Sequence, residues 1–477
     1  MRLDLEQAWI GFLLLLACSW VILCEKTHET VRVRVNVNTV QTGVNRAIMN
    51  SNILEEVAES AAKDQGGAKV IKGIKGLKVK DIRPPIVSVG YVPDEGTEMS
   101  IVSQMTVGGK SFIGGPMEIT VKSNMTVFCN IKRNDKEVVL EMGNCKVDLI
   151  SCNTSLPANM LPKIVNKFLN STLTRVLPGM MCPAAEKVLE IMREHLTSSL
   201  RKHKIGDHGD IEYKLIKNPE ISQDGVILCF ETSMHDKNGD KIETLHRTEM
   251  PKEMPPKKEG YSDILFSTSF LDDLMKMFMD DFHCDVNKAK VPSLTIGKLA
   301  KMIPSISKSL PASKAVKAEI RLKEPVKHSL GPNGSYMTVH STVSFIPEPK
   351  GKSLISFDMF QRWDLEFAVE HEKLKLKIKS VSTKEIKITS KSPGKVEMEP
   401  LKKLMQNIVK TACMPAVNKA LSDNLVPLPN LMGAKYEDST KEFNPFEDTM
   451  MLRTETKKAD YTEVMKKVGE IASKSHP

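Results

Sequence analysis

The chain has 477 residues, 41% of them hydrophobic, which is enough for two sizeable domains with proper cores. The formal net charge of +9 suits acidic partners, but the lysines are spread along the chain and no arginine-rich or aromatic-interleaved basic block occurs. This composition excludes the usual nucleic-acid-binding pattern. Aromatic residues make up only 5%, so Val, Ile, Leu and the 27 Met residues must fill the interior.

Residues 1–24 are typical of a secretion signal, with Arg2 as the positive end and two apolar runs behind it. Cleavage near Cys24 is expected. The alternative is an uncleaved anchor, but Cys18 and Ser19 interrupt the apolar run, which is short for a membrane span. No other run approaches spanning length. The mature chain is therefore expected in an oxidising compartment, without a transmembrane segment.

Nine cysteines become seven when Cys18 and Cys24 leave with the signal, so at least one stays free or pairs between chains. No Cys-x-x-Cys occurs, and the spacing resembles no zinc site, so no metal site is expected. N-glycosylation sequons, which fit a secreted glycoprotein, stand at Asn124, Asn153, Asn170 and Asn333.

Behind the signal, an alternating valine pattern over residues 31–38 predicts a strand with one buried face. Residues 44–62 follow as an amphipathic helix that ends at a Gly-Gly pair. The lysine-rich residues 69–80 allow a phosphate-binding interpretation or the solvated edge of a twisted strand, and their spacing favours the strand edge.

Residues 82–149 read as strands and turns throughout, with turn signals at residues 93–96 and at Gly108 and Gly109. Apolar residues alternate between these turns. This pattern predicts antiparallel hairpins with one face buried.

Residues 144–200 pass from a strand into an amphipathic helix, with an expected break over residues 177–183 and a second helical run after it. Cys145 on the strand and Cys182 at the break would tie the two elements together. Closing a loop of that length is worth about 4 kcal/mol in the chain-entropy model. The alternative is two unrelated free cysteines.

Residues 211–230 predict further strands, and Asn238 with Gly239 predicts a hairpin turn rather than the calcium loop that nearby aspartates suggest. His and Asp residues at positions 203–210 could form a metal cluster, but a polar loop is the favoured interpretation. The Pro- and Lys-rich residues 244–262 predict a linker.

The pattern restarts after this linker, with a helical apolar stripe over residues 270–282, a regular strand over residues 373–379 and a closing helix over residues 401–425. Cys182-Pro in the first half can be laid beside Cys413-Met-Pro in the second. Two copies of one α+β unit is the simplest account.

The ordered set of these motifs resembles the superfamily of bactericidal/permeability-increasing protein (BPI), lipopolysaccharide-binding protein and PLUNC proteins. The likeness is greatest to its two-domain branch, BPI fold-containing family B, and covers about residues 30–435. It is carried by residues 74–86, Cys145 with Cys182 and Pro183, the Pro-rich linker before residues 264–267, and residues 414–421 followed by residues 426–429.

The resemblance implies an α+β fold in which two similar domains, each a twisted antiparallel β-barrel with two long helices, are joined through a central sheet into a boomerang. The domains it implies are a signal at residues 1–24, barrels at residues 25–243 and 263–435, and a charged tail at residues 436–477.

The resemblance also implies that Cys145 pairs with Cys182, the disulfide shared across the family. The internal repeat adds the hypothesis that Cys284 pairs with Cys413. Cys129 and Cys152 are another candidate pair, which would leave Cys229 unpaired.

No enzymatic activity is expected, because the chain lacks GxSxG, HExxH, P-loop and dinucleotide motifs. No catalytic residues and no cofactors are therefore assigned.

The favoured function, partly implied by the resemblance, is that of a secreted glycoprotein which binds phospholipid, fatty acid or another small hydrophobic molecule in apolar pockets. It would act as a carrier or in innate defence in mucosal, nasal or oral secretions. The alternatives are a lipopolysaccharide-binding host-defence protein, and a membrane-regulating or surfactant member retained in the endoplasmic reticulum or secretory vesicles.

Helix positions supply pocket candidates in both halves, although the same helices could instead pack dry on their sheets. The candidates are Leu54, Val57, Ala61, Leu274, Phe278 and Phe282.

Overall fold

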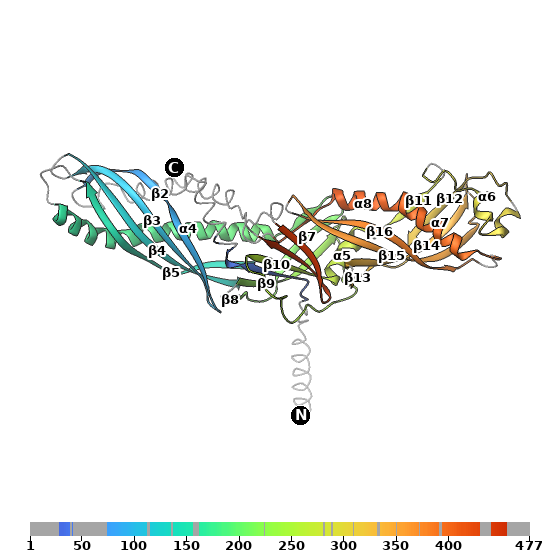
Figure 1. Ribbon diagram of the computed structural model, residues 1–477, viewed down its shortest axis with the longest axis horizontal. Helices are drawn as coiled ribbons and strands as arrows, with labels where there is room; N and C mark the ends of the chain where they lie inside the picture. Colours follow the sequence, from blue (N-terminus) through green and yellow to red (C-terminus); the bar gives the residue numbers. More distant parts are fainter. Residues whose placement is uncertain are drawn as a thin grey trace, which may run out of the picture.

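The structure is a computed structural model of an elongated molecule with three antiparallel sheets along its length (Figure 1). It describes residues 28–38, 41, 74–111, 115–134, 137–155, 162–223, 225–279, 282–287, 290–308, 310–331, 334–349, 351–371, 373–390, 394–429 and 440–455. The expected helix over residues 44–62 lies outside these residues.

A four-stranded meander with one long helix on it forms the first end of the molecule, at the left of Figure 1. Its strands follow chain order, as the hairpin pattern predicted, and helix α4 (Pro162–Leu200) packs on the last of them. The strands are β2 (Ile74–Val92), β3 (Gly96–Ser111), β4 (Pro116–Asn134) and β5 (Glu137–Ser155).

The turn expected at Gly108 and Gly109 is wrong, because β3 continues through both glycines to Ser111. Gly108 lies opposite Glu118 of β4. A Cβ atom at this glycine would meet Cε of Lys80 at 2.5 Å. The glycine therefore makes room for a lysine side chain that crosses the sheet, which explains a strand glycine without a turn.

The break expected over residues 177–183 is also wrong, because α4 runs unbroken for 39 residues with Pro178 and Pro183 inside it. A proline in a helix interior costs about 3 kcal/mol. Burial of side chains on both sides of the prolines, which include Leu169, Leu177 and Leu189, offsets that cost.

A central sheet joins the two ends and takes strands from distant parts of the chain. The order is β18-β19-β10-β1-β9-β7-β6, with β8 paired to β9. The strands are β1 (Val31–Asn36), β6 (His203–Ile205), β7 (Gly209–Leu215), β8 (Glu220–Ser222), β9 (Gly225–Asp236), β10 (Tyr261–Ser267), β18 (Thr440–Phe446) and β19 (Thr449–Glu455). Residues 440–455, expected as part of a charged tail, thus form a hairpin that extends this sheet.

A row of charged residues crosses the middle of the central sheet. Asp263 on β10 lies directly opposite Arg34 on β1 and Arg453 on β19. Its carboxylate is 0% exposed and pairs with both guanidinium groups; Arg453 Nε is 2.6 Å from Oδ1. The row ties the start of the described chain to its end.

The third sheet, at the right of Figure 1, runs in the order β11-β12-β14-β15-β16-β17, with β13 paired to β14. Its strands are β11 (His283–Val286), β12 (Val316–Leu322), β13 (Lys327–Gly331), β14 (Gly334–Pro347), β15 (Ile355–Glu370), β16 (Lys373–Ile388) and β17 (Val426–Pro427). The associated helices are α5 (Thr268–Met279), α6 (Ile296–Ala300), the 3-10 turn η1 (Pro304–Lys308), α7 (Met398–Ile408), the π-helical turn η2 (Val409–Cys413) and α8 (Met414–Asp423).

Two disulfides fix helices to sheets. Cys145 of β5 is bonded to Cys182 of α4, and Cys284 of β11 is bonded to Cys413 of η2, with Cα atoms 5.9 Å apart in both. These are the two pairs that the sequence led us to expect, one at each end of the molecule.

Cys129, Cys152 and Cys229 are free and buried, so the suggested bond between Cys129 and Cys152 is wrong. Cys152 lies opposite Val121 on β4, eight positions from Cys129 on the same strand. At about 3.3 Å per strand residue this is about 26 Å, far beyond the reach of a disulfide.

Candidate ligand-binding pocket

A pocket of about 600 Å³ lies where the central sheet meets α5, β11 and α8. Its walls come from the hairpin that follows β9, the turn between β6 and β7, the end of α5 with Phe282 after it, strand β11 with Lys290 after it, and one face of α8. The residues that line it are His208, Asp236, Lys237, Asn238, Asp240, Lys241, Ile242, Lys276, Met277, Phe278, Phe282, His283, Cys284, Asp285, Lys290, Ala416, Val417 and Ala420.

The apolar wall is made mainly by the end of α5, by Phe282 in the segment after it, and by α8. The first turns of α5 are buried in the core, whereas Phe278 and Phe282 are half-buried and line the pocket. The Phe278 ring meets His208 edge-on at 5.2 Å, and the Phe282 ring meets Trp363 edge-on at 6.2 Å. Val417 of α8 adds an aliphatic surface.

The polar wall is the hairpin of residues 236–242. Gly239 has φ of +89°, as the Asn-Gly turn signal predicted. Backbone N–H groups of Asp240 and Asn238 donate to Asp236 Oδ1. These hydrogen bonds, the one from Asp240 first, lower the pKa of Asp236, so this carboxylate stays ionised and holds the turn together.

Four lysines from three segments stand around the pocket: Lys237, Lys241, Lys276 and Lys290. Lys290 Nζ donates to the backbone oxygen of Asp285 at 3.0 Å. A molecule with an apolar body and an anionic end could place the first on the phenylalanines and the second among these ammonium groups.

The pocket candidates proposed from the second helix divide into two groups. Phe278 and Phe282 line the pocket, whereas Leu274 is 0% exposed and belongs to the core. Leu54, Val57 and Ala61 lie outside the described residues. Sequence reasoning missed the hairpin and α8 as walls. The Asn-Gly signal marked the turn, but nothing in the sequence places it against α5.

Three of the four sequons fall on described residues. Asn153 on β5 and Asn170 on α4 are exposed, and Asn170 therefore lies on the outer face that a glycan requires. Asn124 on β4 is half-buried and accepts a hydrogen bond from Ser100 Oγ at 2.8 Å. Asn333 lies outside the described residues.

Two further segments were candidate sites from the sequence: the lysine-rich residues 69–80 and the His- and Asp-containing residues 203–210. The described part of the lysine-rich segment lies in β2, at the end of the four-stranded order, which agrees with a strand edge. His208 packs on Phe278, and Asp210 pairs with His235 at 3.0 Å and Lys202 at 2.9 Å, so residues 203–210 do not converge as a metal cluster.

A model of the LBP / BPI / CETP family, N-terminal domain, matches residues 36–192. BPI fold-containing family B member 6 of Homo sapiens is 31% identical over 422 residues, which is 87% of this chain and 92% of that protein. The chain belongs to BPI fold-containing family B. Member 3 of the family from Rattus norvegicus is 23% identical over 385 residues, 78% of this chain and 79% of its own length.

The crystal structure of lipopolysaccharide binding protein aligns with a TM-score of 0.53, covering 90% of this chain and 98% of that one. Identity is 13%, so this likeness shows the fold alone. It confirms the expected two-domain boomerang with curled antiparallel sheets. Among the helices that the structure describes, none combines the length and apolar character needed to cross a membrane.

Proposed function

We propose that this chain binds an amphipathic lipid, or a similar small hydrophobic molecule, in the pocket between the central sheet and the third sheet. The observation that carries the proposal is the position of Phe278 and Phe282 beside a rim of lysines. Membership of BPI fold-containing family B supports it. No catalytic step is assigned to the chain.

The energetics agree with such a ligand. Covering about 200 Å² of apolar ligand and pocket surface is worth about 5 kcal/mol at 25 cal/mol per Å². Part of this free energy is offset by the entropy that the ligand loses when it is held in the pocket. A headgroup paired with lysines adds specificity and a dependence on ionic strength.

We further propose secretion as a glycoprotein. The signal pattern of residues 1–24, the exposed sequons Asn153 and Asn170, and the two disulfides support this. The division into barrels at residues 25–243 and 263–435, joined by a linker, belongs to the same proposal, as does a carrier or defence role in mucosal secretions. Detection of the protein only inside cells would favour a retained, membrane-regulating role instead.

Trp363 provides an intrinsic reporter, since it is the only tryptophan beyond the signal and packs on Phe282. Titration of the delipidated chain with a phosphatidylglycerol of short acyl chains should change its fluorescence saturably. Phe278→Asp should weaken binding at least tenfold, whereas the control Leu245→Asp, at an exposed site outside the pocket, should leave it unchanged. Equal affinity in both variants would refute the location.

Four lysines outnumber the three aspartates of the lining, Asp236, Asp240 and Asp285, and this small positive excess favours an anionic lipid. Lipopolysaccharide is therefore the second candidate ligand. Binding of lipopolysaccharide that weakens with salt and competes with phosphatidylglycerol would support it. Saturable binding of a neutral lipid with no effect of salt would argue against it.

A further inference from the structure

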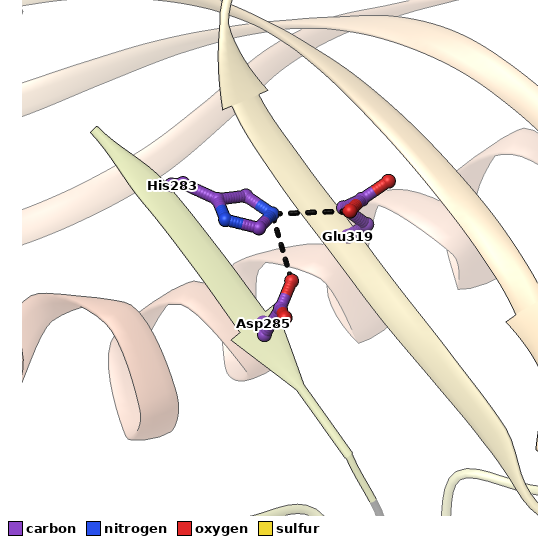
Figure 2. A group of neighbouring side chains, drawn as sticks. All are labelled: His283, Asp285 and Glu319. Atoms are coloured by element: carbon purple, nitrogen blue, oxygen red, sulfur yellow. Dashed lines mark hydrogen bonds and ion pairs between the residues drawn. The ribbon is translucent and has the colours of Figure 1, made fainter. Parts of the chain in front are cut away.

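Three potential metal ligands converge on the outer face of β11 and β12 (Figure 2). His283 Nε2 lies 2.8 Å from Asp285 Oδ1 and 3.1 Å from Glu319 Oε1, and all three donor atoms lie within 4.8 Å of one another. Figure 2 shows the imidazole of His283 directed between the two carboxylates. Of the residues that the structure describes, these three alone form such a group.

The two strands hold these side chains in place. Asp285 lies directly opposite Glu319, and His283 precedes Asp285 by two residues on the same strand, so all three share one face. Cys284 stands between them, points to the other face and is bonded to Cys413 of η2. Strand β11, which carries His283 and Asp285, is thus held by its pairing with β12 and by the disulfide to η2.

The arrangement has an electrostatic cost without a cation. Two carboxylates opposite each other on neighbouring strands repel. His283 Nε2 faces both oxygens but carries at most one proton, so it satisfies one of them at a time. Asp285 Oδ1 is shielded from solvent and makes no contact with the geometry of a hydrogen bond, although Nε2 is 2.8 Å away.

The neighbouring cations leave Asp285 Oδ1 available, whereas one of them competes for Glu319 Oε1. Lys317 Nζ pairs with the other oxygen of Asp285, Oδ2, at 2.6 Å and so orients Oδ1 toward His283. Arg321 Nη2 lies 3.0 Å from Glu319 Oε1, but its side chain is 65% exposed and can move away.

We propose that His283, Asp285 and Glu319 form a binding site for a divalent zinc-class cation at the edge of the pocket. One imidazole nitrogen and two carboxylate oxygens suit zinc, whereas calcium and magnesium prefer more numerous oxygen ligands. Tetrahedral zinc with bonds near 2.0 Å needs ligand atoms about 3.3 Å apart. The two distances from His283 Nε2, 2.8 and 3.1 Å, need only small shifts, whereas the two carboxylate oxygens, which lie within 4.8 Å of each other, would have to close on the ion by side-chain rotation.

The fourth position of this site is open. His283 and Asp285 also line the pocket, so the open position lies beside it, where water or a ligand oxygen could complete the coordination. The cysteine spacing led us to expect no metal site, and this cluster of one histidine and two carboxylates differs from that expectation. A His-x-Asp pair with a Glu 34 residues later matches no spacing motif; only the pairing of β11 with β12 brings the three together. The metal site does not rest on lipid binding.

The test is isothermal titration of the full mature chain, stripped with chelator, using zinc chloride. We expect one zinc ion per chain at this site, with affinity reduced more than tenfold in His283→Ala and in Glu319→Gln. The matched control is His340→Ala, another histidine paired with a carboxylate, Glu324, at 2.9 Å. It should bind zinc as the parent chain does.

Arg321→Gln separates a metal site from a merely attractive cluster of acids. Removing the guanidinium that competes for Glu319 should tighten zinc binding severalfold, and Arg321→Lys should tighten it less. Equal losses in His283→Ala and His340→Ala, no binding to the parent chain, or weaker binding in Arg321→Gln would each overturn the proposal. Melting of the metal-free variants should match that of the parent, which excludes loss of fold as the cause.

Discussion

Replacing Asp263 by Asn is expected to destabilise the central sheet far more than a surface charge change does. The substitution keeps the size of the side chain but removes the negative charge between Arg34 and Arg453. Asp263 is completely buried, and both arginine side chains are only 13% exposed. Two guanidinium groups would then remain in a poorly solvated place without their counter-ion.

The magnitude follows from the burial of the row. Removing one partner of a buried ion pair costs about 3–5 kcal/mol, because the remaining charge is left uncompensated. Arg453 keeps a hydrogen bond to the backbone oxygen of Pro256 at 2.7 Å, which places the expected loss near the lower end. Asp263→Asn should thus lose about 3 kcal/mol of unfolding free energy.

Glu442 provides the matched control. It lies opposite Arg453 at the outer end of the same row and pairs with Lys258 at 2.6 Å, with side chains 36% and 43% exposed. Exposed pairs are worth about 0–1 kcal/mol, so Glu442→Gln should change stability by less than 1 kcal/mol.

Urea unfolding with circular dichroism, combined with hydrogen exchange of peptides from β1, β10 and β19, measures both variants. We expect exchange in Asp263→Asn to accelerate in all three strands together, since the row joins them. A loss no larger than that of Glu442→Gln, or faster exchange confined to β10, would show that the charged row does not hold the three strands together.

Three further predictions concern single residues. Burial raises the pKa of Asp273 to about 6 despite a hydrogen bond from Thr244. The folded state therefore holds a proton that the unfolded state has lost, and the free energy of unfolding falls as pH rises from about 4 to 6. Asp273→Asn should be up to about 3 kcal/mol more stable than the parent at pH 7.5 and no more stable at pH 4, and a gain that does not depend on pH would contradict this. Burial also raises the pKa of the Cys129 and Cys229 thiols to about 12, so iodoacetamide at pH 8 should label neither until the chain unfolds. Labelling of either cysteine in the native chain at the rate of a free thiol would count against their burial. Gly239→Ala should lower the free energy of unfolding by about 1 kcal/mol, because alanine is strained at a φ of +89°. No steric clash adds to this, since no atom lies within 4 Å of the added Cβ. An unchanged melting temperature would argue against the turn.

The local pattern of apolar and polar residues was sufficient to predict most of the strands, and the order of the motifs was sufficient to predict the family. The alternation of residues 31–38 predicts β1, and the Leu-Lys alternation from Lys373 predicts β16, because a sheet with one buried face imposes a period of two. The repeat also led to the pairing of Cys284 with Cys413, which depends on both halves having one architecture.

The errors arose where tertiary packing overrides local propensity. Pro178 and Pro183 signal a break in any isolated helix, but a sheet and a disulfide hold α4 straight through them. Gly108 signals a turn, but a neighbouring lysine needs its space. Asp263 carries no signal at all, since its two partners are 229 and 190 residues away in the chain.

The pocket was predictable only in part for the same reason. Helical spacing indicated Phe278 and Phe282, but the lysines of the hairpin and the surface of α8 come from segments more than 100 residues apart. Their convergence depends on how the central sheet meets the third sheet, and one sequence holds no record of that geometry.

The pocket between the central sheet and the third sheet is proposed to hold a lipid. Native mass spectrometry of the mature chain, purified from a eukaryotic secreted source and followed by organic extraction, tests it most directly. We expect a co-purifying lipid that is lost on denaturation and depleted in Phe278→Asp. A mass equal to that of the bare polypeptide and its glycans, with no uptake of added phospholipid or fatty acid, would contradict it.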